Sequence, residues 1–372
     1  MGQRLILAGG GHAHMMILAH IRNLVRNGHQ VTVIQPSDYH YYSGMGPGML
    51  GLTYTADDIR FATRHVVERQ GGTFIRDKVT GIDAAGRTIA TSSGLTLEYD
   101  VLSCNTGSFV PFQNVHGDTS TIFAVKPIER LQEAQRVVIS LCASRSTPHI
   151  AVVGGGPAAV EIAGNLRRLA NLRGRHMPRI TLFAGRGLLS KLPAAIRSIA
   201  RESLARQNIA INEEGYVQEI RNGRFAVGDS EVCPDLIFMA TGVRPSPLFK
   251  ASGLATGPSG GLLVNEYLHS VEHTEIFGGG DCIDFGPSPL DKVGVYAVRE
   301  NPILLRNVTA RLHGLRLIPF DPGSKYLLLF NMGDGTAIFS KGPVCFRNRS
   351  AFLLKDIIDR RFMRRFQALE RL

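Results

Sequence analysis

The sequence has 372 residues, of which 44% are hydrophobic, and a formal net charge of +11. This length allows two ordinary domains and a tail, and no apolar run reaches the ~20 residues of a transmembrane helix, so any membrane contact would be peripheral. The five cysteines are odd in number, widely spaced and without a C-x-x-C pair, which argues against a disulfide framework or a zinc site.

The charge and the cysteines also bear on location. A basic protein is attracted to anionic surfaces or ligands, although a soluble basic protein without a special partner fits the same charge. No cleavable signal precedes the first strand-like run, and unpaired cysteines favour a reducing compartment. We therefore expect a cytoplasmic protein.

The first predicted unit is a strand, a glycine turn, a helix and a second strand. Residues 5–8 are an apolar run typical of a buried parallel strand, and the glycines of LAGGGHAHMM follow them. Apolar residues at helical spacing then continue to residue 25, before the strand QVTVI. Such a turn directs backbone N–H groups and the positive end of the helix at a pyrophosphate.

Gly9 and Gly11 occupy the first two positions of G-x-G-x-x-G, but His14 stands at the third, where a small residue normally lets helix and strand close. We expect either a helix slightly displaced from its strand or a ring turned outward. His12 and His14 form an H-x-H pair, yet residues i and i+2 of a helix point about 200° apart, so no metal site is predicted. His12 is expected to contact the bound nucleotide instead, and His14 to pack between helix and sheet.

The same pattern returns 145 residues later. The segment HIAVVGGGPAAVEIAGNLRRLA, followed by RITLF, reads as strand, turn, helix and strand, and Gly154, Gly156 and Ala159 fit all three motif positions. One glycine turn would be weak evidence for a dinucleotide site, because many α/β proteins contain one. Two such units predict two dinucleotide-binding domains of similar design.

In each unit the second strand should end in an acid that binds a ribose hydroxyl. The first unit has Gln35, which can still hydrogen-bond a hydroxyl, with Asp38 three residues later. The second has Ala184 and then Arg186. An arginine without an acid favours a 2′-phosphate and hence NADPH, unless Arg186 simply faces solvent.

The remaining segments complete an α/β fold. An alternating meander near residues 73–100 and a passage near residues 230–240 each lead into an apolar strand that ends in Thr-Gly, at Gly107 and Gly242. A helix over 293–312 follows TEIFGGGDCIDF, and the last segment opens with strands around Gly333-Asp334-Gly335. We predict two Rossmann-like domains, one from 1–125 and 245–325 and one from 126–244, with a small α+β segment over 326–372.

Over about residues 1–325, the two glycine turns, the two Thr-Gly strand ends and GGGDC resemble the two-dinucleotide-binding-domain flavoproteins. This superfamily includes the pyridine nucleotide-disulfide oxidoreductases, type II NADH dehydrogenases and sulfide:quinone oxidoreductases. GGGHAHMMIL, YYSGMGPGML, AVKPIERL and LLKDIIDRRFMRRFQ are more similar to the type II NADH dehydrogenase-like branch that is sometimes fused ahead of a selenophosphate synthetase domain, which these 372 residues do not include.

The resemblance implies FAD in the first domain and NADH or NADPH in the second. The implied FAD-binding residues are Gly9, Gly11, His12, Ala13, Gln35, Gly107, Asp281, Val295 and Tyr296. The implied NAD(P)H-binding residues are Gly154, Gly156, Pro157, Ala158, Arg186 and Gly242. Glu161 would be the catalytic residue, near the nicotinamide, although it is equally placed to be an ordinary helix glutamate.

The positions at which the sequence differs from the family limit the reactions that it is expected to catalyse. YYSGMGPGML stands where disulfide reductases carry their cysteine pair, so dithiol chemistry is not expected. We predict an FAD-dependent NAD(P)H dehydrogenase that passes electrons to a quinone or similar acceptor. The alternatives are sulfide or persulfide oxidation through Cys142 or Cys345, whose positions match that group poorly, and a flavoprotein with a degraded nicotinamide site.

The tail bears on the acceptor. From Lys341 to Leu372 it carries a net charge of +6, and five apolar residues form one helical stripe: Leu354, Ile358, Phe362, Phe366 and Leu369. Such a helix suits the surface of an anionic membrane at its cytoplasmic face, or it docks its stripe on the FAD domain or on a second subunit in a homodimer. No nucleic-acid fold accompanies the arginines, so no nucleic-acid partner is expected.

Overall fold

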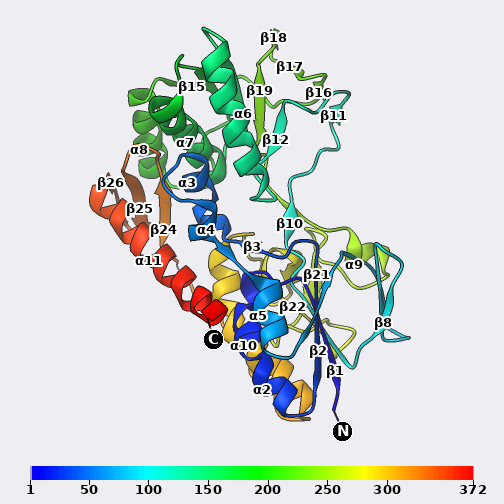
Figure 1. Cartoon of the computed structure of the whole chain (residues 1–372). Coiled ribbons are helices and arrows are strands. Elements are labelled where there is room, and N and C mark those ends of the chain that lie inside the picture. Colours follow the sequence, from blue (N-terminus) through cyan, green and yellow to red (C-terminus); the bar gives the residue numbers. More distant parts are fainter. Residues whose placement is uncertain (1, 325, 372) are drawn as a thin grey trace.

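Two five-stranded parallel sheets form the two halves of the molecule (Figure 1). The computed structural model describes residues 2–324 and 326–371. The first sheet has the order β22-β9-β1-β2-β5: Ile276–Gly278, Val101–Cys104, Arg4–Ala8, Gln30–Gln35 and Thr73–Arg76. The second has the order β12-β19-β13-β14-β15: Ile122–Ala124, Leu236–Met239, His149–Val153, Arg179–Phe183 and Ile209–Asn212. The predicted pair of Rossmann-like units is confirmed.

The central strands explain the apolar runs of the sequence. β9, β13 and β19 are buried along their whole length, as is typical of central strands in a parallel sheet. The α-helices are α1 Met15–Ala19, α2 Ile21–Arg26, α3 Gly46–Leu50, α4 Ala56–Ile59, α5 Thr63–Arg69, α6 Arg130–Ser144, α7 Pro157–Arg173, α8 Ala194–Arg206, α9 Leu248–Ala251, α10 Gly294–Leu312 and α11 Arg349–Gln367. Short 3₁₀ helices are η1 His12–His14, η2 Ser43–Met45, η3 Gly280–Cys282 and η4 Ala368–Arg371.

The helix that the sequence predicts after the first glycine turn is broken into η1, α1 and α2. At His20 the ring Nδ1 lies 2.8 Å from the carbonyl of Met16, while the His20 N–H donates to Ile17 instead. A side chain that binds a helix carbonyl competes with the backbone, so the helix restarts at Ile21.

The chain crosses between the two halves at one antiparallel pair, β10 (Ser108–Phe109) with β20 (Arg244–Pro245). β12 pairs with β19, so residues 122–124 lie in the second sheet, ahead of the predicted boundary at residue 125. Strands of three residues carry too little periodicity to be assigned from sequence. We propose the β10–β20 crossing as the domain boundary in place of residue 125.

Each half also contains smaller sheets. The pairings are β3-β4, β6-β7-β8, β11-β16-β17-β18, β21-β23 and β24-β25-β26. In the first half these strands are His40–Tyr41, Arg60–Phe61, Val79–Asp83, Thr88–Thr91, Thr96–Glu98, Leu262–Val264 and Ile283–Phe285. In the second half they are Val115–His116, Ile220–Arg221, Arg224–Val227 and Ser230–Val232. The meander before β9 is confirmed.

The C-terminal segment joins the two halves. β24 (Leu328–Asn331), β25 (Ala337–Lys341) and β26 (Val344–Asn348) form the predicted antiparallel strands, which contact α7 and α8 of the second half. An added Cβ on Gly164 of α7 would lie 2.2 Å from the carbonyl oxygen of Met332, so this approach requires glycine. α11 then runs along one side of the molecule toward the first half, where the Ala62 N–H donates to Glu370 at 2.8 Å (Figure 1).

The predicted stripe of α11 is divided between two environments. Toward the C-terminus, Met363 and Phe366 are buried and Phe362 is half-buried against the first half. Toward the N-terminus, four apolar side chains are exposed: Leu353 at 58%, Leu354 at 38%, Ile357 at 62% and Ile358 at 42%. Among residues 2–324 and 326–371, no helix combines the length and apolar character that crossing a bilayer requires.

Candidate functional site

The first glycine turn is wedged between the ends of three strands of the first sheet. Gly9 has φ +93°, and an added Cβ there would lie 2.3 Å from the carbonyl oxygen of Asn105, just beyond β9. A Cβ on Gly10 would lie 2.6 Å from Oε1 of Gln35, the last residue of β2. The turn therefore needs its glycines for conformation and for space.

Gln35 lies in the predicted place, but its amide is already engaged. Its Oε1 accepts the Gly10 N–H at 3.0 Å, and its Nε2 donates to the carbonyls of Ser37 and Tyr39 at 2.6 and 2.9 Å. Because these bonds hold the turn and the following loop together, this conformation gives the predicted ribose contact no free side-chain N–H group.

His14 packs between the turn and the first sheet, as expected, and its ring is not turned outward. Its ring is fully buried rather than turned outward, with Nδ1 2.6 Å from the Gly9 carbonyl and Nε2 2.8 Å from Ser103 Oγ. This pattern requires Nδ1–H to donate to Gly9 and Nε2 to accept from Ser103. Burial lowers the pKa of His14 to about 4, so the ring is a neutral bridge between the turn and β9.

The second glycine turn is packed in the same way between strand ends of the second sheet. Gly154 has φ +142°, and an added Cβ would lie 2.1 Å from the carbonyl oxygen of Ala240, after β19. Pro157 is the first residue of α7, a position where its missing N–H costs nothing. A Cβ on Gly156 would meet nothing within 4 Å, so this side of the turn is open.

One cavity of about 1830 Å³ joins the two turns. Most of the residues predicted from the sequence line it: Gly9, Gly11, His12, Gln35, Gly107, Gly154, Gly156, Pro157, Ala158, Glu161, Gly242, Asp281 and Val295. Three others do not: Ala13 is buried in the core, Tyr296 packs edge-on against Tyr326, and Arg186 lies over the Tyr216 ring. Gly107 and Gly242 both have positive φ, at +69° and +101°.

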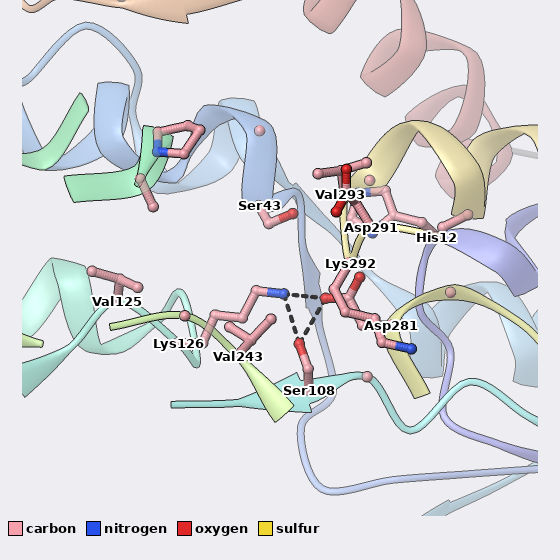
Figure 2. Close-up of a pocket in the computed structure, with 18 of the residues that line it drawn as sticks. His12, Ser43, Ser108, Val125, Lys126, Val243, Asp281, Asp291, Lys292 and Val293 are labelled. Atoms are coloured by element: carbon pink, nitrogen blue, oxygen red, sulfur yellow. Dashed lines mark hydrogen bonds and ion pairs between the residues drawn. The ribbon is translucent and has the colours of Figure 1, made fainter. Parts of the chain in front are cut away.

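A partly buried ion pair lines the cavity, and its two residues come from segments far apart in the sequence. Lys126 Nζ is 2.6 Å from Asp281 Oδ2 and 3.0 Å from Ser108 Oγ, and Ser108 donates to the same carboxylate at 2.6 Å (Figure 2). Burial alone would raise the pKa of Asp281, but Lys126, Ser108 and Lys292 together hold it below its usual value. Lys126 and Ser108 were not predicted, although AVKP and the Thr-Gly end mark their segments.

A second cluster gathers acids and a lysine around Glu161. Glu161 Oε1 accepts the Asn331 N–H at 2.8 Å, and the nearby Lys355 and Asp359 of α11 pair at 2.7 Å. The Tyr42 hydroxyl donates to Asp359 at 3.1 Å. Burial raises the pKa of Glu161 to about 7, although the Lys355 charge opposes the shift. Lys355 and Asp359 were not predicted as site residues, because neither belongs to the apolar stripe from which the docking of this helix was inferred.

The two cysteines considered for sulfur chemistry, Cys142 and Cys345, do not line the cavity. Cys142 is fully buried in α6 and Cys345 is half-buried in β26. No cysteine is among the described residues that line the cavity. Neither thiol that a sulfide or persulfide oxidation would use therefore reaches this site.

Comparison with known proteins gives a consistent result. The sequence profile of the family described as pyridine nucleotide-disulphide oxidoreductase matches residues 3–300. The chain is 25% identical to ferroptosis suppressor protein 1 of Taeniopygia guttata, over 71% of each chain, and 21% identical to the type II NADH:quinone oxidoreductase of Staphylococcus saprophyticus, over 96% of this chain and 94% of that one. The structure of NDH2 from Plasmodium falciparum in complex with NADH superposes with a TM-score of 0.82 at 15% identity, covering 100% of this chain and 98% of that one.

Proposed function

Because this chain belongs to the pyridine nucleotide-disulphide oxidoreductase family, we propose that it is an FAD-dependent enzyme that takes hydride from NAD(P)H and passes electrons to a quinone or a similar acceptor. The observation that carries the proposal is the single cavity lined by both glycine turns. Two dinucleotides bound at these turns would meet inside one shared cavity, which is what direct transfer between them requires.

The first turn fits FAD. Asn105 Oδ1 is buried beside Gly11 without a partner among the described residues, so it would accept a hydrogen bond from a hydroxyl group of the bound dinucleotide. Gly9, Gly11 and His12 would hold the pyrophosphate, while Asp281, Lys126 and Gly107 line the deeper part of the cavity. A bound flavin supplies the redox chemistry, since it accepts a hydride from reduced nicotinamide and releases two electrons.

The protein itself contributes a proton donor, Glu161, and a charged pair beside it, Lys355 and Asp359. Reduction of a quinone by NAD(P)H consumes one proton in addition to the hydride. Glu161 holds a proton on its carboxyl group near neutral pH, because burial raises its pKa to about 7. Lys355 and Asp359 stay paired beside it, and Lys355 also donates to the Gly44 carbonyl at 2.8 Å, which fixes the wall of the cavity.

Anaerobic reduction followed by reoxidation tests the activity. The purified protein should carry or take up FAD, its flavin absorbance should bleach with NADH or NADPH, and a short-chain quinone should restore it. A protein that cannot be reconstituted with FAD would contradict the proposal. Slow bleaching with both nucleotides would instead support a degraded nicotinamide site, and reoxidation that needs Cys142 would support sulfur chemistry.

We propose a preference for NADPH. Beyond β14 stand Ala184 and Arg186 where an NAD-binding acid would lie, and Lys191 and Tyr216 line the cavity nearby. The acid at the end of β15, Glu213, is occupied by Arg201 at 2.5 Å and by the Leu188 N–H at 2.6 Å. These cations favour a 2′-phosphate. Arg186→Ala should raise KM for NADPH about tenfold or more and leave KM for NADH nearly unchanged; equal effects on both would contradict the preference.

We propose that the acceptor arrives from a membrane at the cytoplasmic face. Ile358 and Phe362 of α11 line the cavity, and the exposed face of Leu353, Leu354 and Ile357 lies next to them. Arg361, Arg364 and Arg365 are exposed on the same helix. An apolar face with flanking arginines suits an anionic lipid surface. A second copy of the chain is the competing occupant, and its signature is a dimer in solution that detergent dissociates.

A further inference from the structure

Four aromatic rings from three separate segments meet in the wall of the cavity. His12 comes from η1, His40 from β3, Tyr42 from the residue before η2, and Phe362 from α11. The His12 ring stacks on Phe362 at 5.8 Å and 16°, lies 4.9 Å from Tyr42, and meets His40 edge-on at 4.6 Å. All four residues line the cavity.

The two imidazoles share one hydrogen bond and leave one nitrogen without a partner. His40 Nε2 lies 3.0 Å from His12 Nδ1. His12 is only 9% exposed, and its Nε2 is buried without a hydrogen-bond partner among the described residues. Buried polar groups in folded proteins are almost always paired, so an orphan nitrogen in a cavity wall indicates a missing ligand.

The charge around His12 decides what this nitrogen binds. Burial and the nearby Lys126 hold the pKa values of both histidines low, that of His40 at about 4, so each ring is neutral and carries one N–H. The adjoining glycine turn and Lys126 make this part of the cavity suitable for negative or electron-rich atoms. Such a ligand atom is a hydrogen-bond acceptor, which requires the hydrogen of His12 to be on Nε2.

We propose that His12 donates a hydrogen bond from Nε2–H to an oxygen atom of bound FAD, and that His40 is the positioning residue that fixes this tautomer by donating its own Nε2–H to His12 Nδ1. The inference rests on the proposed function, since it requires FAD at the first glycine turn. Tyr42 and Phe362 hold the ring by packing, so the C-terminal helix takes part in shaping the FAD site.

Amide side chains separate the two nitrogens of His12. The amide N–H of glutamine can replace Nε2–H, that of asparagine replaces only the Nδ1 position, and phenylalanine keeps the ring contacts but has no nitrogen. The variants are therefore His12→Gln, His12→Asn and His12→Phe, with His40→Gln and His40→Phe as the second pair. His65→Gln, at an exposed position of α5 outside the cavity, is the matched control.

The measurement is the Kd of FAD for each apoprotein, by quenching of flavin fluorescence, with the visible spectrum of the bound flavin as a second readout. We expect His12→Asn and His12→Phe to bind FAD about tenfold more weakly or worse, and His12→Gln to stay within about threefold of the parent. His40→Phe should weaken binding and His40→Gln should restore it, while His65→Gln has no effect.

Equal binding by His12→Asn, His12→Gln and the parent would overturn the inference, as would equal loss in His12→Asn and His12→Gln, which would assign the effect to ring packing alone. Far-UV circular dichroism of the apoproteins identifies variants that do not fold, and the His40 pair then carries the test. A parent protein that binds no FAD would refute the proposed function itself, which is a different result.

Discussion

His14 stands at a motif position that normally holds a small residue. The ring is accommodated there because it forms hydrogen bonds to both the turn and the sheet. Its two ring nitrogens bind Gly9 and Ser103, so the ring joins the segments that a glycine would only let approach. A buried imidazole with both nitrogens paired carries no desolvation penalty for an orphan group. The expectation of an outward ring was wrong because it considered the size of the side chain and not its hydrogen bonds.

Removing this ring should destabilise the first unit. His14→Ala leaves a void and unpairs the Gly9 carbonyl and the Ser103 hydroxyl, so we expect the free energy of unfolding to fall by about 2–4 kcal/mol. Urea denaturation of the apoprotein measures it. His65→Ala, at an exposed site, should change stability by less than about 0.5 kcal/mol; a similarly small change for His14→Ala would contradict the bridging role.

Glu161 should make stability depend on pH. Its folded pKa of about 7 lies above the ordinary value of 4.5, so between these values the folded protein binds more protons than the unfolded chain. Stability from this group is present below pH 4.5 and is lost as pH rises through 7. Relative to Glu161→Gln, the parent should therefore lose on the order of 1–3 kcal/mol from pH 5 to pH 8, by urea denaturation. A pH-independent difference would mean that Glu161 is ionised throughout.

The same proton should appear in the kinetics. If Glu161 supplies it to the acceptor, reoxidation of the reduced protein by quinone slows above pH 7 in the parent, while Glu161→Gln is slow at every pH. Stopped-flow reoxidation between pH 5.5 and 8.5 measures both. An unchanged rate in Glu161→Gln would show that the proton comes from elsewhere, for example through Asp359.

At the scale of elements, α11 performs two tasks in one helix. Its C-terminal half packs on the first unit through Met363 and Phe366, and the buried Lys355–Asp359 pair reaches the cavity. The N-terminal half leaves Leu353 and Ile357 more than half exposed. The two interpretations of the predicted stripe, docking and surface contact, thus apply to different halves, and a heptad-like pattern alone cannot separate them.

The exposed half gives a prediction about lipid. Leu353→Ser together with Ile357→Ser should reduce sedimentation with vesicles that contain anionic phospholipid by about tenfold, because each lost apolar contact weakens binding. Leu172→Ser with Met177→Ser, which removes two exposed apolar side chains of the second unit, is the matched control. Equal sedimentation of parent and serine variant would exclude this face as the lipid contact.

Sequence patterns correctly predicted the elements that carry a distinct motif or a regular alternation of apolar and polar residues. Both glycine turns, both Thr-Gly ends, the meander and the C-terminal strands are present. They did not predict the helix break at His20, which depends on one side chain, or the extent of the second sheet, whose edge strand β12 has three residues. Lys126 and Asp281 are 155 residues apart, and only the fold brings such partners together.

At the scale of the whole molecule, two sheets of matching strand order face one cavity. Their edge strands come from opposite sides in sequence, since β22 follows the second unit and β12 opens it. α3 contacts α6 and α7, and the C-terminal strands pack against α7 and α8. The two halves are therefore also packed against each other. Residues of both halves line the cavity, so ligands bound at the two turns would connect the halves.

Binding should then stabilise the molecule as a unit. At a free FAD concentration of 100 times its Kd, we expect about 2.7 kcal/mol of added stability, and NADP⁺ should add a further increment to the FAD-loaded protein. Differential scanning calorimetry with each ligand alone and with both measures this. Stabilisation by FAD that is confined to one of two separate transitions would show that the halves unfold independently.

The β10–β20 crossing has a consequence for engineering and for descent. Phe109 and Arg244 pair directly, so the whole second unit is a cassette whose ends adjoin. Joining the two ends by a short linker would therefore not stretch the host chain, although α3 and the C-terminal strands would lose the surfaces that they pack against. The matching strand order of host and insert is what a copied gene segment placed inside its own template would leave behind.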